Sequence, residues 1–110
     1  MRFVLLALVI LAGCAPAPEP DPSLAAIERH FGHLGDGVVE EAKAVAWCES
    51  KWDPNAVNGQ YRGLFQLGRY YDSTIAFYGG DPYDPDTNAQ AARDGYVSHD
   101  HTWAQWSCKP

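Results

Sequence analysis

The first 22 residues limit what this chain of 110 residues can fold into. A single positive charge at Arg2 precedes an apolar run from Phe3 to Ala12. Because a bilayer span needs about 20 residues, a run this short indicates the core of a signal peptide. Prolines at positions 16, 18, 20 and 22 then keep the following segment extended. We therefore expect one domain over residues 23–110, small enough to need a covalent crosslink.

The residues Leu11-Ala12-Gly13-Cys14 resemble the lipobox of bacterial lipoproteins, in which a cysteine that becomes lipidated follows a small-residue cleavage site. They predict a lipoprotein signal peptide over residues 1–13, lipidation at Cys14 and a proline-rich linker over residues 14–22. The expected location is the cell envelope, with the lipid at Cys14 as membrane anchor. The alternative is an ordinary secretory signal cleaved nearby, which would give a secreted protein.

The cysteine count supplies a candidate crosslink. If Cys14 is acylated, Cys48 and Cys108 remain as one pair, and export favours a disulfide between them. Such a bridge would close a loop of about 60 residues and contribute about 4 kcal/mol in the chain-entropy model. The alternative is two free thiols. The histidine pairs His30/His33 and His99/His101 lack a third ligand with suitable spacing, so we expect no metal site and no cofactor.

The chain is acidic, with 14 Asp and Glu against 8 Lys and Arg and a formal net charge of −6. This balance argues against nucleic-acid binding. It also gives no electrostatic steering toward an anionic polymer such as cell-wall glycan. Binding to such a polymer would have to come from local chemistry in a cleft.

Apolar spacing predicts helices along most of the domain. The first runs over residues 23–31 with Ser23 as its N-cap, and the second follows a cap at Asp36. The apolar face of the second helix continues onto Glu49 and includes four residues before it: Val38, Ala42, Val45 and Ala46.

Asn58-Gly59 predicts a short hairpin, and residues 70–78 a further helix. Asp86 or Thr87 would cap a last helix over residues 88–103, with Ala89, Ala92, Tyr96 and His99 on its inner face. The expected fold class is α+β, mainly helical, with a short β-hairpin.

Glu49 is the strongest candidate for chemistry. Its carboxyl continues an apolar face, with Trp47 and Trp52 on either side, and the neighbouring Cys48 would fix its backbone. Desolvation would raise the pKa of such a carboxyl and suit it to general acid catalysis. The alternative is a surface glutamate at a helix end.

The usual glycosidase needs a second carboxylate. Five aspartates are candidates, and none has a distinguishing setting: Asp53, Asp81, Asp84, Asp86 and Asp94. If Glu49 acts alone, it must serve first as acid and then as base. Six aromatic residues could stack on sugars or pack in the core: Trp52, Tyr61, Tyr70, Tyr71, Trp103 and Trp106. Trp106 is the best core candidate among them.

Four short motifs together resemble the soluble lytic transglycosylases of the lysozyme-like superfamily. They are Glu49-Ser50, Asn55-Ala56, Gly63-Leu64-Phe65-Gln66 and Asp86-x-Asn88-Ala89-x-x-Ala92. The Cys48-Glu49-Ser50 opening and the Trp103-x-x-Trp106-x-Cys108 ending are also similar to the resuscitation-promoting-factor branch. The resemblance covers residues 34–110.

The resemblance implies a small lysozyme-like domain that cleaves the β-1,4 bond between N-acetylmuramic acid and N-acetylglucosamine in peptidoglycan strands. It makes Glu49 the single catalytic acid and base. It also implies that Ser50, Gln66, Asn88 and a glutamate-facing Tyr96 position or bind the substrate, with Tyr61 among the cleft aromatics. The expected protein is a monomer. The alternatives are a hydrolytic lysozyme and a catalytically inactive glycan-binding lipoprotein.

Overall fold

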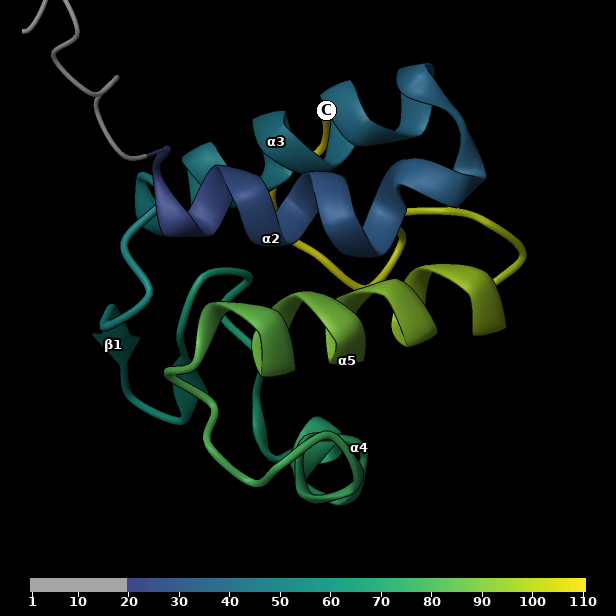
Figure 1. Cartoon of the computed structure of the whole chain (residues 1–110). Coiled ribbons are helices and arrows are strands. Elements are labelled where there is room, and N and C mark those ends of the chain that lie inside the picture. The colour runs from purple at the N-terminus through teal and green to yellow at the C-terminus, as the bar shows by residue number, and fades with distance from the viewer. Residues whose placement is uncertain (1–19) are drawn as a thin grey trace, which may run out of the picture.

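The computed structural model describes residues 20–110 (Figure 1). The predicted signal peptide and the lipidation at Cys14 lie outside the described residues, as does most of the predicted linker. The fold is mainly helical with a two-stranded antiparallel sheet, which confirms the predicted fold class. In chain order the elements are α2 (Pro22–Phe31), η1 (Gly32–Leu34), α3 (Asp36–Ser50), β1 (Val57–Asn58), β2 (Tyr61–Arg62), η2 (Arg69–Tyr71), α4 (Asp72–Phe77) and α5 (Pro85–Ser98).

Both α2 and α5 begin with an Asp-Pro pair. The Asp21 carboxylate accepts a hydrogen bond from the backbone N–H of Ser23 at 2.8 Å, and Asp84 accepts one from Thr87 at 2.9 Å. The proline that follows each aspartate has no N–H to leave unpaired, and its fixed φ suits the first helical position. The predicted caps at Ser23 and at Asp86 or Thr87 are therefore wrong.

Three further helix boundaries differ from the prediction. Gly35, with φ of 108°, is the N-cap of α3, so Asp36 is the first helical residue instead of the cap. The helix expected over residues 70–78 divides into η2 and α4. Helix α5 ends at Ser98, because Asp100 and His101 both adopt φ of 58°, a left-handed conformation that a right-handed helix cannot contain.

The C-terminal end of α3 is fixed by an unusual turn. Lys51 and Trp52 have φ of 54° and 60°, which is uncommon for two consecutive residues other than glycine. The Lys51 N–H donates to the Trp47 carbonyl at 2.8 Å, and the Trp52 indole N–H donates to the Lys43 carbonyl at 2.9 Å. This turn ends α3 directly after Glu49 and Ser50.

The predicted hairpin at Asn58-Gly59 is present. Asn58 pairs with Tyr61 and Val57 with Arg62, and Gly59 takes φ of 61° in the connecting turn. The loop after it folds back, because Arg62 and Leu67 form an isolated antiparallel bridge. This places Gln66 beside the hairpin.

The core lies where α2 packs against α3 and α5 (Figure 1). An aromatic cluster fills its centre: Phe31, Phe65, Tyr96, Trp103 and Trp106. Trp106 is 5% exposed, which confirms it as a core residue. The chain after α5 returns toward α3, where Figure 1 marks the C-terminus. Among the helices within residues 20–110, none combines the length and apolar character needed to span a membrane.

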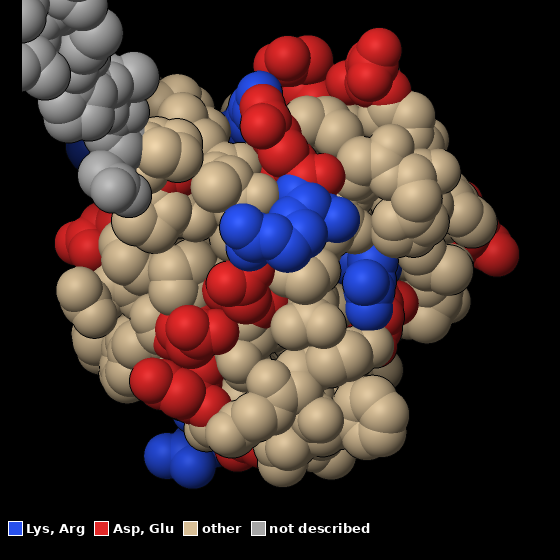
Figure 2. Space-filling model, in the orientation of Figure 1, with Lys and Arg blue, Asp and Glu red and all other residues tan. Residues whose placement is uncertain are grey.

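Four of the seven lysines and arginines among residues 20–110 form ion pairs. Lys43 contacts Glu28 at 2.9 Å, and Arg62 contacts Asp72 at 2.6 Å. Hydrogen bonding to Glu28 raises the pKa of Lys43. Figure 2 shows the consequence on one face of the molecule, where blue and red groups adjoin each other within a larger uncharged area.

Candidate active site

A groove with a volume of about 540 Å³ lies between the end of α3, the hairpin, η2 and the C-terminal tail. Its lining consists of one carboxylate, several amide and hydroxyl side chains, and apolar surface. The lining residues are Glu49, Asn58, Gln60, Tyr61, Gln66, Leu67, Gly68, Tyr70, Tyr71, Gln105, Trp106 and Ser107. The groove therefore contains three of the predicted site residues, namely Glu49, Tyr61 and Gln66.

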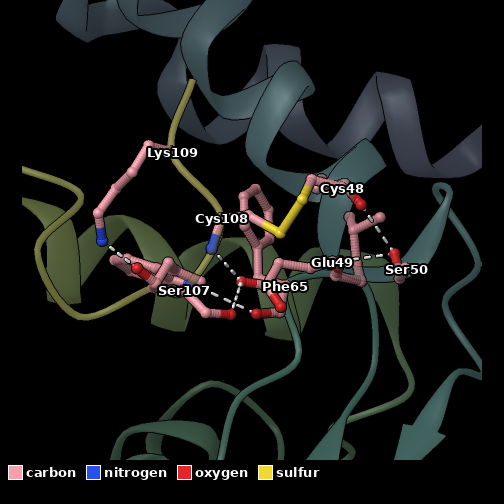
Figure 3. The surroundings of a disulfide bond; sticks show 10 residues. Cys48, Glu49, Ser50, Phe65, Ser107, Cys108 and Lys109 are labelled. Carbon is pink, nitrogen blue, oxygen red and sulfur yellow. Dashed lines mark hydrogen bonds between the residues drawn. A yellow bond between two sulfur atoms is a disulfide. The ribbon is translucent and has the colours of Figure 1, made fainter.

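Glu49 is half-buried in the last turn of α3 and reaches toward the tail (Figure 3). Its Oε2 atom accepts hydrogen bonds from the Cys108 backbone N–H at 3.3 Å and from the Ser107 hydroxyl at 3.4 Å. Its Oε1 atom has no partner among residues 20–110. One oxygen of the carboxylate is thus oriented by the protein, and the other remains available in the groove.

The disulfide between Cys48 and Cys108 connects the two segments that meet at Glu49 (Figure 3). The predicted pairing is therefore present in the structure, with a Cα–Cα distance of 5.9 Å. Trp106 adds a second anchor, because its indole N–H donates to the Phe65 carbonyl at 3.0 Å. The tail is held by a covalent bond on one side of Ser107 and by a buried ring on the other.

Ser50 lies behind the groove instead of lining it. Its hydroxyl contacts two carbonyl oxygens, that of Leu64 at 2.7 Å and that of Ala46 at 3.1 Å. A hydroxyl proton can be donated to only one of them at a time. The contact with Leu64 connects the end of α3 to the loop that contains Gln66. Ser50 therefore stabilises this loop without lining the groove.

Gln66 lines the groove in a strained conformation, with φ of 52°. Its side-chain Nε2 donates to the carbonyls of Gly63 at 3.0 Å and Ala56 at 3.1 Å. Both amide protons are thereby used within the protein. The carbonyl Oε1 is the end of the side chain that remains for a ligand, as an acceptor.

Asn88 is fully buried and forms hydrogen bonds with the same loop. Its Oδ1 accepts from the Phe65 N–H at 2.8 Å, and its Nδ2 donates to the carbonyls of Pro82 at 2.9 Å and Arg62 at 3.1 Å. Gly63 makes this approach possible, because a Cβ there would lie 2.4 Å from Nδ2 and 2.3 Å from the Pro82 oxygen. Asn88 thus lies outside the groove and has no exposed surface for direct contact with a ligand.

Tyr96 also lies outside the groove. Its ring is 5% exposed and packs against Trp103, with 4.6 Å between ring centroids, and against Phe31 at 6.4 Å. Burial, and then the nearby Glu41 carboxylate, raise the pKa of the Tyr96 phenol. Ala89, Ala92 and Tyr96 are buried as predicted for the inner face of α5, whereas His99 lies beyond the end of the helix and is half-buried. Tyr96 faces the core instead of Glu49.

The predicted cleft aromatics divide between groove and core. Tyr61 and Tyr70 are 47% and 75% exposed at the groove, where their rings are open to a ligand. Tyr71 is buried at the groove wall, where its hydroxyl donates to Gln105, and burial followed by the influence of Tyr70 raises its pKa to about 12. Trp106 is buried but contributes to the wall.

Trp52 and Trp103 do not line the groove. The Trp103 indole N–H donates to Glu41 at 2.8 Å in the core, and Trp52 closes the turn after α3.

Sequence reasoning missed the amide side chains Asn58, Gln60 and Gln105 and the hydroxyl of Ser107. The hairpin signal placed Asn58 and Gln60 near a turn but gave no reason to assign them to a site. A signal did exist for the tail. A Cys48–Cys108 disulfide requires the residues just before Cys108 to lie near Glu49.

None of the five candidate second carboxylates lines the groove. Asp53 and Asp81 accept local backbone hydrogen bonds, Asp84 caps α5, and Asp94 pairs with Arg93 and Tyr78. Asp86 pairs with Arg29 and His30. Its partial burial acts to raise its pKa, but these hydrogen bonds outweigh burial and hold the pKa below its ordinary value. Glu49 is the only carboxylate among the described residues that line the groove.

Two of the four histidines, His30 and His99, form hydrogen bonds within the domain. His30 Nε2 lies 2.8 Å from Asp86 Oδ1, and His99 Nδ1 lies 2.8 Å from the Gly95 carbonyl. Within residues 20–110 there is no group of three His, Cys, Asp or Glu side chains arranged to hold a metal ion.

The chain belongs to the lysozyme-like domain family. The model of that family matches residues 25–108, which is most of the chain and the whole of the region that forms the groove. This confirms the predicted superfamily. Comparisons with curated proteins and with solved structures give no significant match. Membership of the family indicates an activity of the glycosidase or transglycosylase type related to peptidoglycan.

Proposed function

We propose that this protein cleaves the β-1,4 bond between N-acetylmuramic acid and N-acetylglucosamine in peptidoglycan, by a single-glutamate lytic transglycosylase mechanism. The observation that supports this most is the isolation of Glu49. It is the only carboxylate among the described groove residues, whereas a two-carboxylate glycosidase requires a second one within about 10 Å across the scissile bond.

In the proposed reaction, Glu49 first acts as a general acid. Its protonated carboxyl gives a proton to the bridging oxygen while the bond from that oxygen to the muramyl C1 breaks. Glu49 then acts as a general base and withdraws the proton of the muramyl 6-hydroxyl, whose oxygen bonds to C1. The product is a 1,6-anhydromuramyl end, and Glu49 is protonated again for the next cycle.

The remaining groove residues suit a saccharide. We propose that the exposed rings of Tyr61 and Tyr70 stack on pyranose faces and that Gln66 Oε1 accepts a hydrogen bond from a sugar hydroxyl or N–H. Ser107 and the Cys108 N–H would keep the Glu49 carboxyl aimed at the scissile oxygen. Ser50 and Asn88 would act as positioning residues, through the loop that contains Gln66. An enzyme of this kind acts outside the cytoplasm, in agreement with the exported lipoprotein predicted for residues 1–14.

The test is analysis of muropeptides after digestion of purified peptidoglycan with wild type and with Glu49→Gln. We expect anhydromuramyl ends with wild type and a loss of at least 100-fold in their formation with Glu49→Gln, which removes the proton donor. Glu40→Gln is the matched control, because Glu40 lies on the same helix with its side chain 74% exposed and outside the groove; it should keep wild-type activity.

Two outcomes would replace this proposal. Reducing muramyl ends that depend on Glu49 would identify a hydrolytic lysozyme, in which water takes the place of the 6-hydroxyl. Glycan binding without turnover by either form would identify an inactive glycan-binding lipoprotein.

A further inference from the structure

We infer that the groove selects uncharged glycan strands, in which the carboxylates attached to the muramyl residues are absent or amidated, over strands with free carboxylates. The inference concerns the ligand of the site described above and rests on the proposed function for its choice of sugar. It follows from the charge of the groove and of the side chains around it.

The lining offers neutral hydrogen-bonding groups and one carboxyl group, that of Glu49. Four amide side chains and four hydroxyl groups face the groove, and among the described residues no lysine, arginine or histidine lines it. Amides and hydroxyls match the acetamido and hydroxyl groups of N-acetylhexosamines. A carboxylate on the ligand would find no cation in this lining. It would be repelled by Glu49 in its ionised form, although not by the protonated form that begins the proposed reaction.

Two cations close in sequence to groove residues have partners in the structure, a carboxylate for Arg62 and neutral carbonyls for Lys109. Arg62 contacts Asp72 at 2.6 Å, and the Lys109 ammonium donates to the Trp103 carbonyl at 3.0 Å and to that of Trp106. Arg69 is exposed on η2 beside Gly68 and Tyr70, but it does not line the groove. Like Lys51 and Lys109, it forms no ion pair among residues 20–110, so its charge could offset that of Glu49 for a ligand that extends past the rim.

The net negative charge of the chain also disfavours binding of anionic ligands. A formal net charge of −6 lowers the local concentration of any anionic ligand. Both effects are electrostatic and are screened over about 10 Å at 0.1 M salt and about 3 Å at 1 M salt. A preference that arises from charge must therefore weaken as salt is added, whereas one that arises from shape would persist.

The experiment compares two tetrasaccharides that differ only in charge. Both alternate N-acetylglucosamine and N-acetylmuramic acid through sulfur linkages that resist cleavage; one has free lactyl carboxylates and the other has them amidated. Dissociation constants for the full chain are measured by calorimetry at 20 mM and 500 mM salt. We expect the amidated ligand to bind about tenfold more tightly at low salt and about twofold at high salt.

Variants identify the source of the preference. Glu49→Gln should reduce the low-salt preference to about threefold or less, because it removes the charge in the groove. Glu40→Gln removes one negative charge outside the groove and should leave the preference for the amidated ligand near tenfold. Arg69→Gln should increase the preference, since it removes an exposed cation between the groove residues Gly68 and Tyr70.

Equal or tighter binding of the carboxylate ligand at low salt would overturn the inference, as would a preference unchanged by salt or by Glu49→Gln. Failure of both ligands to bind would also overturn it. These measurements require no turnover, so they are independent of the digestion test. A charge preference without new muramyl ends would refute the proposed reaction alone, and cleavage without a charge preference would refute the inference alone.

Discussion

The backbone N–H of Cys108 donates a hydrogen bond to the Glu49 carboxylate at 3.3 Å, across 59 residues of sequence. The side chain of the same cysteine is bonded to Cys48, the residue before Glu49. One residue of the tail thus contacts both the backbone next to the candidate catalytic acid and the acid itself. The position of Glu49 in the groove depends on the tail as much as on α3.

Reduction of the disulfide should lower stability and activity together. Loss of a crosslink across about 60 residues costs about 4 kcal/mol in the chain-entropy model, and it frees the segment with Gln105, Trp106 and Ser107 from α3. Thermal unfolding and peptidoglycan digestion should be followed with and without dithiothreitol, with oxidised dithiothreitol as the control reagent. Full activity in a reduced protein, with two titratable thiols at Cys48 and Cys108, would contradict the assigned role of the tail.

Gly63→Ala and Gly59→Ala should differ in their effect on stability, although both glycines have positive φ. At Gly59, with φ of 61° and no neighbour within 4 Å of an added Cβ, we expect a loss of about 1 kcal/mol from backbone strain. At Gly63, with φ of 76°, the Cβ would also collide with Pro82 and Asn88, so the loss should exceed about 3 kcal/mol. Denaturant titration measures both values, and equal losses would show that the Asn88 contacts do not restrict this loop.

Tyr71 should make the domain sensitive to alkaline pH. Its pKa in the folded state is about 12, above the ordinary value of 10.0, because burial disfavours the phenolate. The stability that Tyr71 contributes by staying neutral in the folded state is therefore complete below pH 10. It is lost as the pH rises toward 12. By pH 11 Tyr71 is ionised in the unfolded chain and mostly neutral in the folded chain. This difference lowers the free energy of unfolding by roughly 1.4 kcal/mol.

Urea unfolding of wild type and Tyr71→Phe at pH 9 and pH 11 checks this expectation. Between pH 9 and pH 11 the free energy of unfolding should fall by roughly 1.4 kcal/mol less in Tyr71→Phe than in wild type. Tyr70→Phe, at a ring that is 75% exposed, is the control and should keep most of the wild-type difference. Identical losses in wild type and Tyr71→Phe would contradict the prediction.

Local patterns in the sequence predicted much of the fold. The apolar spacing located the inner faces of α3 and α5, and Asn58-Gly59 located the hairpin. The predicted helix starts are wrong because Ser23, Asp86 and Thr87 each follow an Asp-Pro pair. The aspartate of each pair is the N-cap. Those pairs, Asp21-Pro22 and Asp84-Pro85, were a local signal that could have been used.

The candidate site was less predictable because it is assembled from distant segments. Periodicity indicates that Tyr96 points inward, and the family resemblance makes Asn88 a site residue. Neither signal can distinguish the core from the far side of a groove. Gln105 enters the groove through tertiary contacts with Tyr71, a residue 34 positions earlier. Such contacts depend on how helices pack, which spacing within one helix does not encode.

The anchoring of the tail also determines when the site can exist during synthesis. The segment with Gln105, Trp106 and Ser107 follows Glu49 by more than 50 residues, so the ribosome makes it after α3. Until Cys108 has left the ribosome, Glu49 lacks its backbone donor and the groove lacks one wall. The complete groove therefore forms only after the segment up to Cys108 has been synthesised.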